Sequence, residues 1–179
     1  PKDHLGEPWA TPLPEARLSS FLAAGAEVGE DGGLDAFLSG QIEDATARYN
    51  LRNVIGDDGK PVPREVETLS RLVDLAGATP ETVGRIVQAL ASGRAAPGSA
   101  GGAPDAATPL APAAAEDLAW AGVDEASLQR LLPLVEVLPV RSPINLNTAP
   151  REVLAAVLGL DLGTAQRLAQ VRVRAPFDS

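Results

Sequence analysis

The stretch that decides the fold is Ile144-Asn145-Leu146-Asn147-Thr148-Ala149-Pro150. It is typical of a helix start, because the Thr148 oxygen can accept from free backbone N–H groups and Pro150 fits a first turn. Four apolar residues follow at helical spacing, namely Val153, Leu154, Val157 and Leu158. Gly159 predicts a stop in the left-handed conformation, and the helical period resumes over 162–173. The segment therefore predicts a helix-hairpin-helix-like unit, with four structural residues: Asn145, Asn147, Thr148 and Gly159.

Such a unit occurs in DNA-binding modules, which hold a phosphate on the free N–H groups of a Gly-hydrophobic-Gly turn. Here the turn reads Gly159-Leu160-Asp161, so a carboxylate replaces the second glycine. Three arginines on the second predicted helix keep the DNA hypothesis open: Arg167, Arg172 and Arg174. The net charge of −9 opposes it, because clustered cations are needed to displace counterions from DNA. We therefore expect a packing unit and no nucleic-acid partner, with a helix-hairpin-helix DNA-binding protein of uptake or repair as the alternative.

Composition limits the chemistry of the chain. Hydrophobic residues make up 45% of it and aromatic residues 3%, so its core is expected to consist of aliphatic side chains. It contains no Cys and a single histidine, His4, so thiol catalysis and a catalytic triad are not expected. Glu43-Asp44 and Asp57-Asp58 lack the alternating oxygen ligands of a calcium loop and are interpreted as hydrated turn carboxylates. The residues by themselves point to no enzyme, no catalytic residue and no cofactor, and they leave metal ligands unknown.

The N-terminal part is predicted to contain strands. A short helix is expected over 15–24, and residues 36–54 alternate with a period of two. That alternation predicts two strands joined around Asp44-Ala45-Thr46, followed by a turn over 56–59.

Helical patterns dominate the remainder. Helices are expected around 66–73 and 83–90, the first ending at Gly77. Residues 93–115 are almost all Ala, Gly, Pro and Ser, which predicts a flexible loop. A helical pair over 118–134 and a short extended piece over 135–138 lead into the decisive stretch.

The order of these pieces resembles the type II (general) secretion pathway protein K family of minor pseudopilins. Four stretches carry the resemblance: residues 3–10 (DHLGEPWA), residues 40–53 (GQIEDATARYNLRN), residues 131–139 (LLPLVEVLP) and residues 144–149 (INLNTA). The second is similar to the family signature I-x-D-x-x-x-R-[FY]-N-L-N, and the last to its I-N-[LV]-N-T-A run. Where the family carries an Asp-rich stretch, this chain has Ala91-Ser92-Gly93-Arg94-Ala95.

The resemblance implies an α+β protein. A partial pilin-like antiparallel sheet would occupy residues 1–60, and a larger all-helical domain residues 61–179, with the flexible loop 93–115. It further implies a non-enzymatic protein at the tip of the pseudopilus, where it caps the filament. The partners that the resemblance implies are the minor pseudopilins I and J, and secreted substrates are a second kind of partner. Calcium is the cofactor that the family suggests. Because the chain starts at Pro1 without a leader, we expect a periplasmic fragment of an inner-membrane protein of a Gram-negative bacterium, attached to the membrane through an absent N-terminal helix.

The predicted sheet provides the expected partner surface. Its apolar residues are Leu38, Ile42, Tyr49 and Leu51. A sheet that lacks strands and a packing helix is marginal alone and presents apolar surface to a partner.

Overall fold

The computed structural model describes residues 3–17, 36–93 and 111–178. The strands in these ranges are β1 (Leu13–Arg17), β2 (Phe37–Gly40), β3 (Tyr49–Asn50) and β4 (Val135–Glu136). The α-helices are α2 (Pro63–Ala76), α3 (Glu81–Ser92), α4 (Glu125–Leu131), α5 (Arg151–Leu158) and α6 (Leu162–Arg174). Short 3-10 helices are η1 (Pro8–Ala10), η2 (Ala45–Ala47), η3 (Leu51–Val54) and η4 (Ala115–Ala119).

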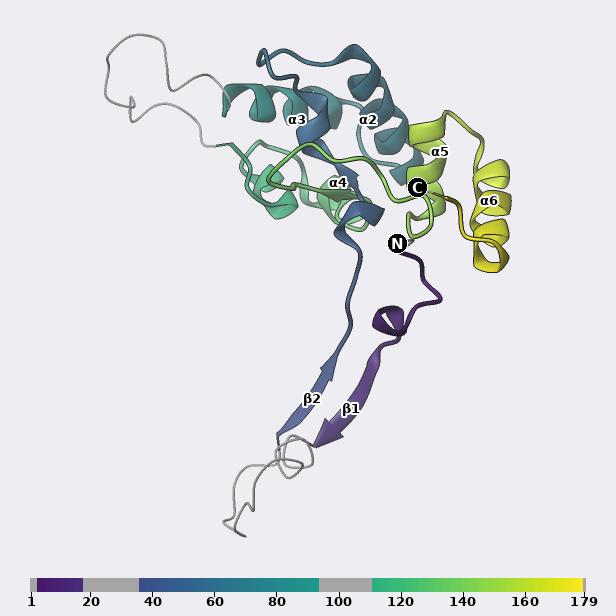
Figure 1. Cartoon of the computed structure of the whole chain (residues 1–179). Helices are drawn as coiled ribbons and strands as arrows, with labels where there is room; N and C mark the ends of the chain where they lie inside the picture. The colour runs from purple at the N-terminus through teal and green to yellow at the C-terminus, as the bar shows by residue number, and fades with distance from the viewer. Residues whose placement is uncertain (1–2, 18–35, 94–110, 179) are drawn as a thin grey trace.

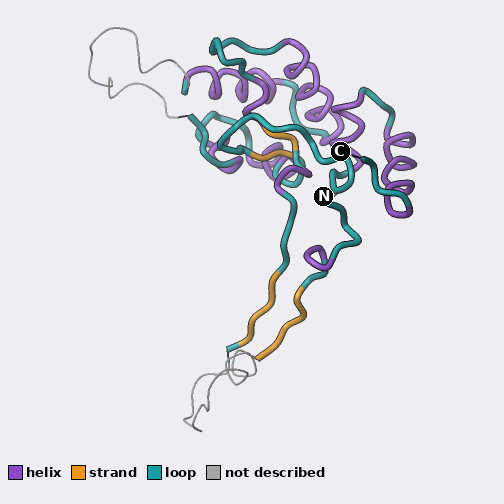
Figure 2. The backbone as a smooth tube through the Cα atoms, viewed as in Figure 1, coloured by secondary structure: helices purple, strands orange, loops and turns teal. Residues whose placement is uncertain are grey.

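Two parts are evident in the ribbon. Strands β1 and β2 pair antiparallel and extend away from the other elements (Figure 1). We call these two strands the arm, and we call residues 45–93 and 111–178 the helical body. Figure 2 shows that helices and loops make up most of the body, with only the short β3–β4 pair as sheet. The predicted α+β class, a small antiparallel sheet beside a larger helical part, is therefore confirmed.

Helix α2 forms the centre of the body and packs against α3, α4 and α5. Its apolar stripe of Leu69, Leu72 and Val73 is fully buried, as the helical period predicts. Gly77 ends α2 with a φ of 67°, a left-handed conformation that glycine adopts without steric cost. Helix α6 packs on α5, so the predicted pair of helices lies at one side of the body.

The segment before α2 belongs to the core of the body. Tyr49 and Leu51 are 1% and 0% exposed, and Val54 and Ile55 join them in the same buried cluster. Strand β3 pairs in parallel with β4, and this pairing joins the segment to a part of the body that is distant in the sequence. Tyr49 and Leu51 therefore cannot serve as partner-binding residues while the body is folded, and the prediction is wrong for these two. The division of the chain at residue 60 stays a prediction, but this packing argues for a boundary nearer to Asp44.

The expected pairing of two strands around Asp44-Ala45-Thr46 is wrong. The residues at the predicted turn form η2, and the Asp44 carboxylate accepts from the Thr46 N–H at 2.8 Å. An Asp side chain that satisfies nearby backbone N–H groups favours such a helical cap over a strand turn. The flanking strands do exist, but β2 pairs with β1 and β3 pairs with β4.

The helix predicted over 15–24 is also wrong where the structure describes it. Residues up to Arg17 form β1, and the rest of the range lies outside the described residues. The predicted loop 93–115 falls largely outside them as well. At its end, Pro112 and Ala115 are buried, so the chain has already rejoined the body there. None of the helices within the described ranges is long and apolar enough to cross a bilayer.

Candidate interaction site: the arm and its junction with the body

The arm exposes almost all of its residues. Every residue of β2 is exposed, and in β1 only Ala16 is partly covered. Leu38 is 46% exposed and Ile42, just beyond β2, is 64% exposed. In the described residues no other element packs across either face of the arm, which stands clear of the body (Figure 1).

The two faces of the arm differ in chemistry. Ala16 lies opposite Leu38, and Leu13 lies opposite Gly40, with an irregularity of register between them. Directly opposed residues in an antiparallel pair share a face, so Leu13, Ala16 and Leu38 make one face apolar. On the other face Arg17 lies over the ring of Phe37, with its guanidinium carbon 5.8 Å from the ring centroid. The arm thus offers an apolar face and leaves it uncovered.

Asp44 holds the segment after β2 to the body. We call the segments next to the strands, residues 3–12 before β1 and residues 41–44 after β2, the two roots of the arm. One carboxylate oxygen, Oδ1, accepts from the backbone and the hydroxyl of Thr46 at 2.8 and 2.6 Å. The other, Oδ2, accepts from Asn145 Nδ2 at 2.8 Å and from Thr148 Oγ1 at 2.7 Å. Burial would raise the pKa of Asp44, but the hydrogen bonds from Thr46, Thr148 and Asn145 outweigh it and hold that pKa below its ordinary value. The carboxylate is therefore charged at neutral pH and fully used in structure. We call Asp3, Asp44, Thr46, Asn145 and Thr148 the junction.

The two asparagines of the decisive stretch hold separate chain segments. Asn145 Nδ2 also donates to the Asp3 carbonyl oxygen at 3.1 Å, on the segment that leads into the arm. The Asn147 side chain pairs with the backbone of Phe177, donating to its carbonyl at 3.1 Å and accepting from its N–H at 2.8 Å. The chain entering the arm and the chain leaving α6 are thereby held at neighbouring positions.

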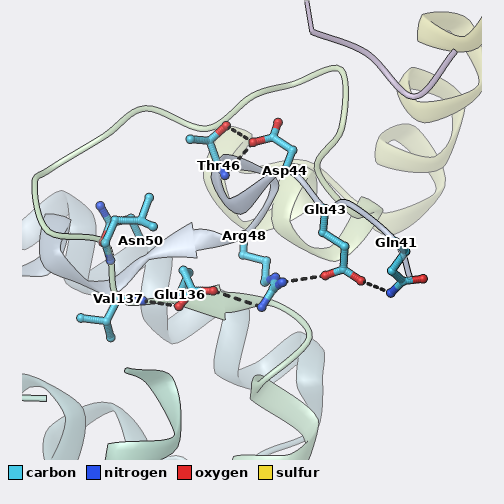
Figure 3. A network of polar contacts seen from close by, with 9 residues as sticks. Gln41, Glu43, Asp44, Thr46, Arg48, Asn50, Glu136 and Val137 are labelled. Carbon is cyan, nitrogen blue, oxygen red and sulfur yellow. Dashed lines mark hydrogen bonds and ion pairs between the residues drawn. The ribbon is translucent and has the colours of Figure 1, made fainter. Parts of the chain in front are cut away.

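A second polar network lies beside the junction (Figure 3). Arg48 pairs with Glu43 at 2.7 Å and with Glu136 of β4 at 3.1 Å, and Gln41 donates to Glu43 at 2.6 Å. These contacts are partly exposed, so each is worth little on its own. They nevertheless join the segment after β2 to strand β4, which is distant in the sequence.

The rest of the signature-like segment faces a loop of the body. Asn50 Nδ2 donates to the Val140 carbonyl and to Ser142 Oγ, and its Oδ1 accepts from the Leu138 N–H at 3.2 Å. Asn53 pairs with the backbone of Ser142 in the same way that Asn147 pairs with Phe177. The polar residues of these motifs are thus structural ties between distant segments.

Thr148 and Arg172 differ from their predicted roles. Thr148 does not cap α5, because the helix begins at Arg151 and Pro150 occupies the N-cap position. The Thr148 hydroxyl donates to the Asp44 carboxylate. Arg172 is not a surface cation available to phosphate: it is 8% exposed, and its Nη1 donates to the carbonyls of Leu146 and Ala149 at 2.7 and 2.6 Å. Burial lowers the pKa of Arg172. Gly159 ends α5 with a φ of 66°, the left-handed stop that the sequence predicts.

The turn between α5 and α6 is already occupied by its own carboxylate. Asp161 accepts from the Thr164 backbone N–H at 2.9 Å and from the Thr164 hydroxyl at 2.6 Å, which caps α6. These hydrogen bonds lower the pKa of Asp161, so it stays charged. A phosphate at this helix start would meet a negative charge on the donors that it needs.

Carboxylates lie apart from one another in the residues that the structure describes. In these ranges no three His, Asp or Glu side chains gather closely enough to hold a metal ion. Asp44 is used by the junction, and Asp58 accepts from the Lys60 N–H at 3.0 Å. The calcium that the family suggests is therefore not supported by the donor set described here.

Sequence reasoning missed the strand partner of β2 and the roles of Asp44 and Arg172. The local signal for β1 is weak, because Leu13 and Ala16 are three residues apart and Pro14 is tolerated just before a helix that would start at Glu15. Arg172 falls at helical spacing on the same face as Ala165, Leu168 and Ala169, and this period was the signal for its burial.

A body of packed helices with an uncovered two-stranded arm defines an α+β protein of two parts. Two models described as "Type II secretion system (T2SS), protein K" match the chain, one over residues 47–140 and one over residues 144–179. The chain therefore belongs to the type II secretion system protein K family and is a minor pseudopilin of that system.

Two individual proteins are similar to it. The type II secretion system protein K of Pseudomonas aeruginosa is 34% identical over 192 residues, which cover 100% of this chain and 53% of the relative. A chain in the crystal structure of the GspK-GspI-GspJ complex from the enterotoxigenic Escherichia coli type 2 secretion system matches with a TM-score of 0.58 and 18% identity, over 95% of this chain and 71% of that chain. The second likeness concerns the fold, and the chain spans about half the length of the Pseudomonas relative.

Proposed function

We propose that this chain is part of a non-enzymatic minor pseudopilin that caps the pseudopilus tip and binds the minor pseudopilins I and J. In this role it aids assembly of the pseudopilus for export of folded proteins across the outer membrane. Membership of the protein K family supports the proposal, as does the likeness of its fold to a chain of the GspK-GspI-GspJ complex. The family further suggests a periplasmic domain of an inner-membrane protein.

The observation that carries the proposal is the uncovered arm. A lone two-stranded sheet is marginally stable in water, because it buries too little apolar surface to offset its ordering entropy. The arm has an apolar face formed by Leu13, Ala16 and Leu38, and Ile42 adds exposed apolar surface at its root. A neighbouring pseudopilin that covers this face would supply the missing burial. Leu38 and Ile42 are therefore the proposed partner-binding residues.

The shape of the chain is compatible with capping. The body lies at one end of the molecule and the arm extends from it in one direction (Figure 1). If the arm joins the filament, a bulky body is held beyond it. Another subunit would then find its position above this one occupied.

Size-exclusion chromatography with soluble I and J subunits tests the proposal. We expect coelution of the three proteins and a higher melting temperature for this chain, because a partner that binds only the folded state stabilises it. Leu38→Asp should abolish coelution, since it places a charge on the apolar face. Trp120→Asp is the matched control, because it changes an exposed apolar side chain of the body. Separate elution of the unsubstituted proteins, with no thermal shift, would count against the assignment.

A further inference from the structure

We infer that Asn145 is a positioning residue that fixes the direction of the arm relative to the helical body. Its side-chain amide has two hydrogens to donate. One goes to the Asp3 carbonyl, before β1, and the other to the Asp44 carboxylate, after β2. A single amide group thus bridges the two roots of the arm.

The remaining polar atoms of Asn145 hold it rigidly in the body. Its Oδ1 accepts from the Asn147 N–H at 3.0 Å, and its carbonyl accepts from the N–H groups of Thr148 and Ala149. Its backbone N–H donates to the Thr46 carbonyl at 3.0 Å. Because the amide oxygen is held by the body, the amide nitrogen can face only the arm's roots. The residue is therefore oriented before it contacts the arm.

Apolar packing between the arm and the body is incomplete. A cavity of about 290 Å³ lies where the arm's roots meet the body, lined among others by Trp9, Ile42 and Pro133. Side chains across such a space lose the close contacts that make packing directional. The Glu43–Arg48 pair is partly exposed, and exposed ion pairs contribute little. The junction hydrogen bonds are thus the contacts best placed to limit swinging of the arm.

The inference does not depend on the partners proposed above, because every group in it belongs to this chain. Its consequence for an assembly protein is geometric. An arm held at a fixed direction would hold the body at one defined orientation on whatever surface the arm joins.

Double electron–electron resonance between two spin labels tests the inference directly. The chain has no Cys, so Ser39→Cys in β2 and Gln129→Cys in α4 can be labelled without background. Both positions are exposed. We expect one narrow distance distribution in the otherwise unchanged 179-residue chain. Asn145→Ala should broaden that distribution at least twofold, while the far-ultraviolet circular dichroism of the helices is retained.

Asn53→Ala is the matched control. The Asn53 amide donates one hydrogen bond and accepts one, both with the backbone of Ser142 within the body. This variant loses the same kind of contacts without touching the arm, so its distribution should stay narrow. Equal broadening in both variants would show a general loosening and would overturn the positioning role.

Asp44→Ala keeps the test decisive if Asn145→Ala does not fold. It removes the acceptor that Asn145 and Thr148 share and keeps the Asn145 amide itself. It should also broaden the distance distribution between the two spin labels. A distribution that is already broad in the unsubstituted chain, or one that stays narrow in folded Asn145→Ala or Asp44→Ala, would refute the inference.

Discussion

Replacing Arg172 with alanine should destabilise the body strongly. The guanidinium donates through Nη1 to the carbonyls of Leu146 and Ala149, just before α5, at 2.7 and 2.6 Å. It therefore fastens α6 to the stretch that contains Asn145 and Asn147. Truncation leaves both carbonyls without this donor, and the contact to Ala149 is buried.

The magnitude follows from these two contacts. A hydrogen bond from a charged donor contributes about 1.5–3 kcal/mol, and a buried acceptor left without a partner costs about 1–3 kcal/mol. Part of this is offset, because the variant no longer has to desolvate a guanidinium. We expect a loss of about 2–4 kcal/mol in the free energy of unfolding. For a chain of this size, that loss corresponds to a fall of roughly 4–16 °C in melting temperature.

Urea denaturation followed by circular dichroism at 222 nm measures the effect. Arg167→Ala is the control, because Arg167 lies on the same helix with an exposed side chain and should change stability by less than about 0.5 kcal/mol. If Arg172→Ala were as stable as Arg167→Ala, the two carbonyl contacts would not hold α6, and the reasoning would fail.

Three further predictions follow from single residues. Gly84→Ala should stabilise the protein by about 0.5–1 kcal/mol, since Gly84 lies exposed in α3 with open space for a methyl group. Gly159→Ala should instead cost about 1–2 kcal/mol, because φ at Gly159 is 66°. Denaturation midpoints of the two variants that shift in the same direction would contradict this. The stability that Asp44 contributes, measured as the difference from Asp44→Ala, should be constant above pH about 4 and should fall below it. Its pKa is lower when folded, so the contribution is lost as the pH drops through that lower value; a loss that begins near neutral pH would be inconsistent with the hydrogen bonds described. Fluorescence anisotropy at low salt should show no saturable binding to duplex DNA, because Asp161 occupies the helix start, and micromolar binding that weakens steeply with salt would contradict this.

The elements that repeat along the sequence were predictable. The stripes of α2 and α3 follow the helical period, and Gly77 and Gly159 mark helix ends because both need a left-handed backbone. Pairing across the chain was not predictable from these patterns. Apolar and polar residues would alternate along β2 whichever strand it paired with. Its pairing with β1 instead of β3 is therefore decided by contacts between segments that are distant in the sequence.

The candidate site was predicted only in part. Leu38 and Ile42 are exposed, as a partner surface requires, whereas Tyr49 and Leu51 are buried. All four are apolar residues in one alternating segment, and only the packing of β3 on β4 separates them. The junction was beyond local reasoning as well, because Asp44 and Asn145 are separated by 101 residues in the sequence.

Hydrogen–deuterium exchange of this chain, alone and mixed with soluble pseudopilins I and J, tests the central claim most directly. The account predicts slower exchange on mixing in peptides that cover β1 and residues 36–42, because the partner covers the arm. Peptides of α3 should exchange at unchanged rates, since the body is proposed to point away from the filament. Protection that falls on α3 while the arm remains unchanged, or no protection anywhere in the chain, would contradict the claim that this chain joins the pseudopilus tip through its arm.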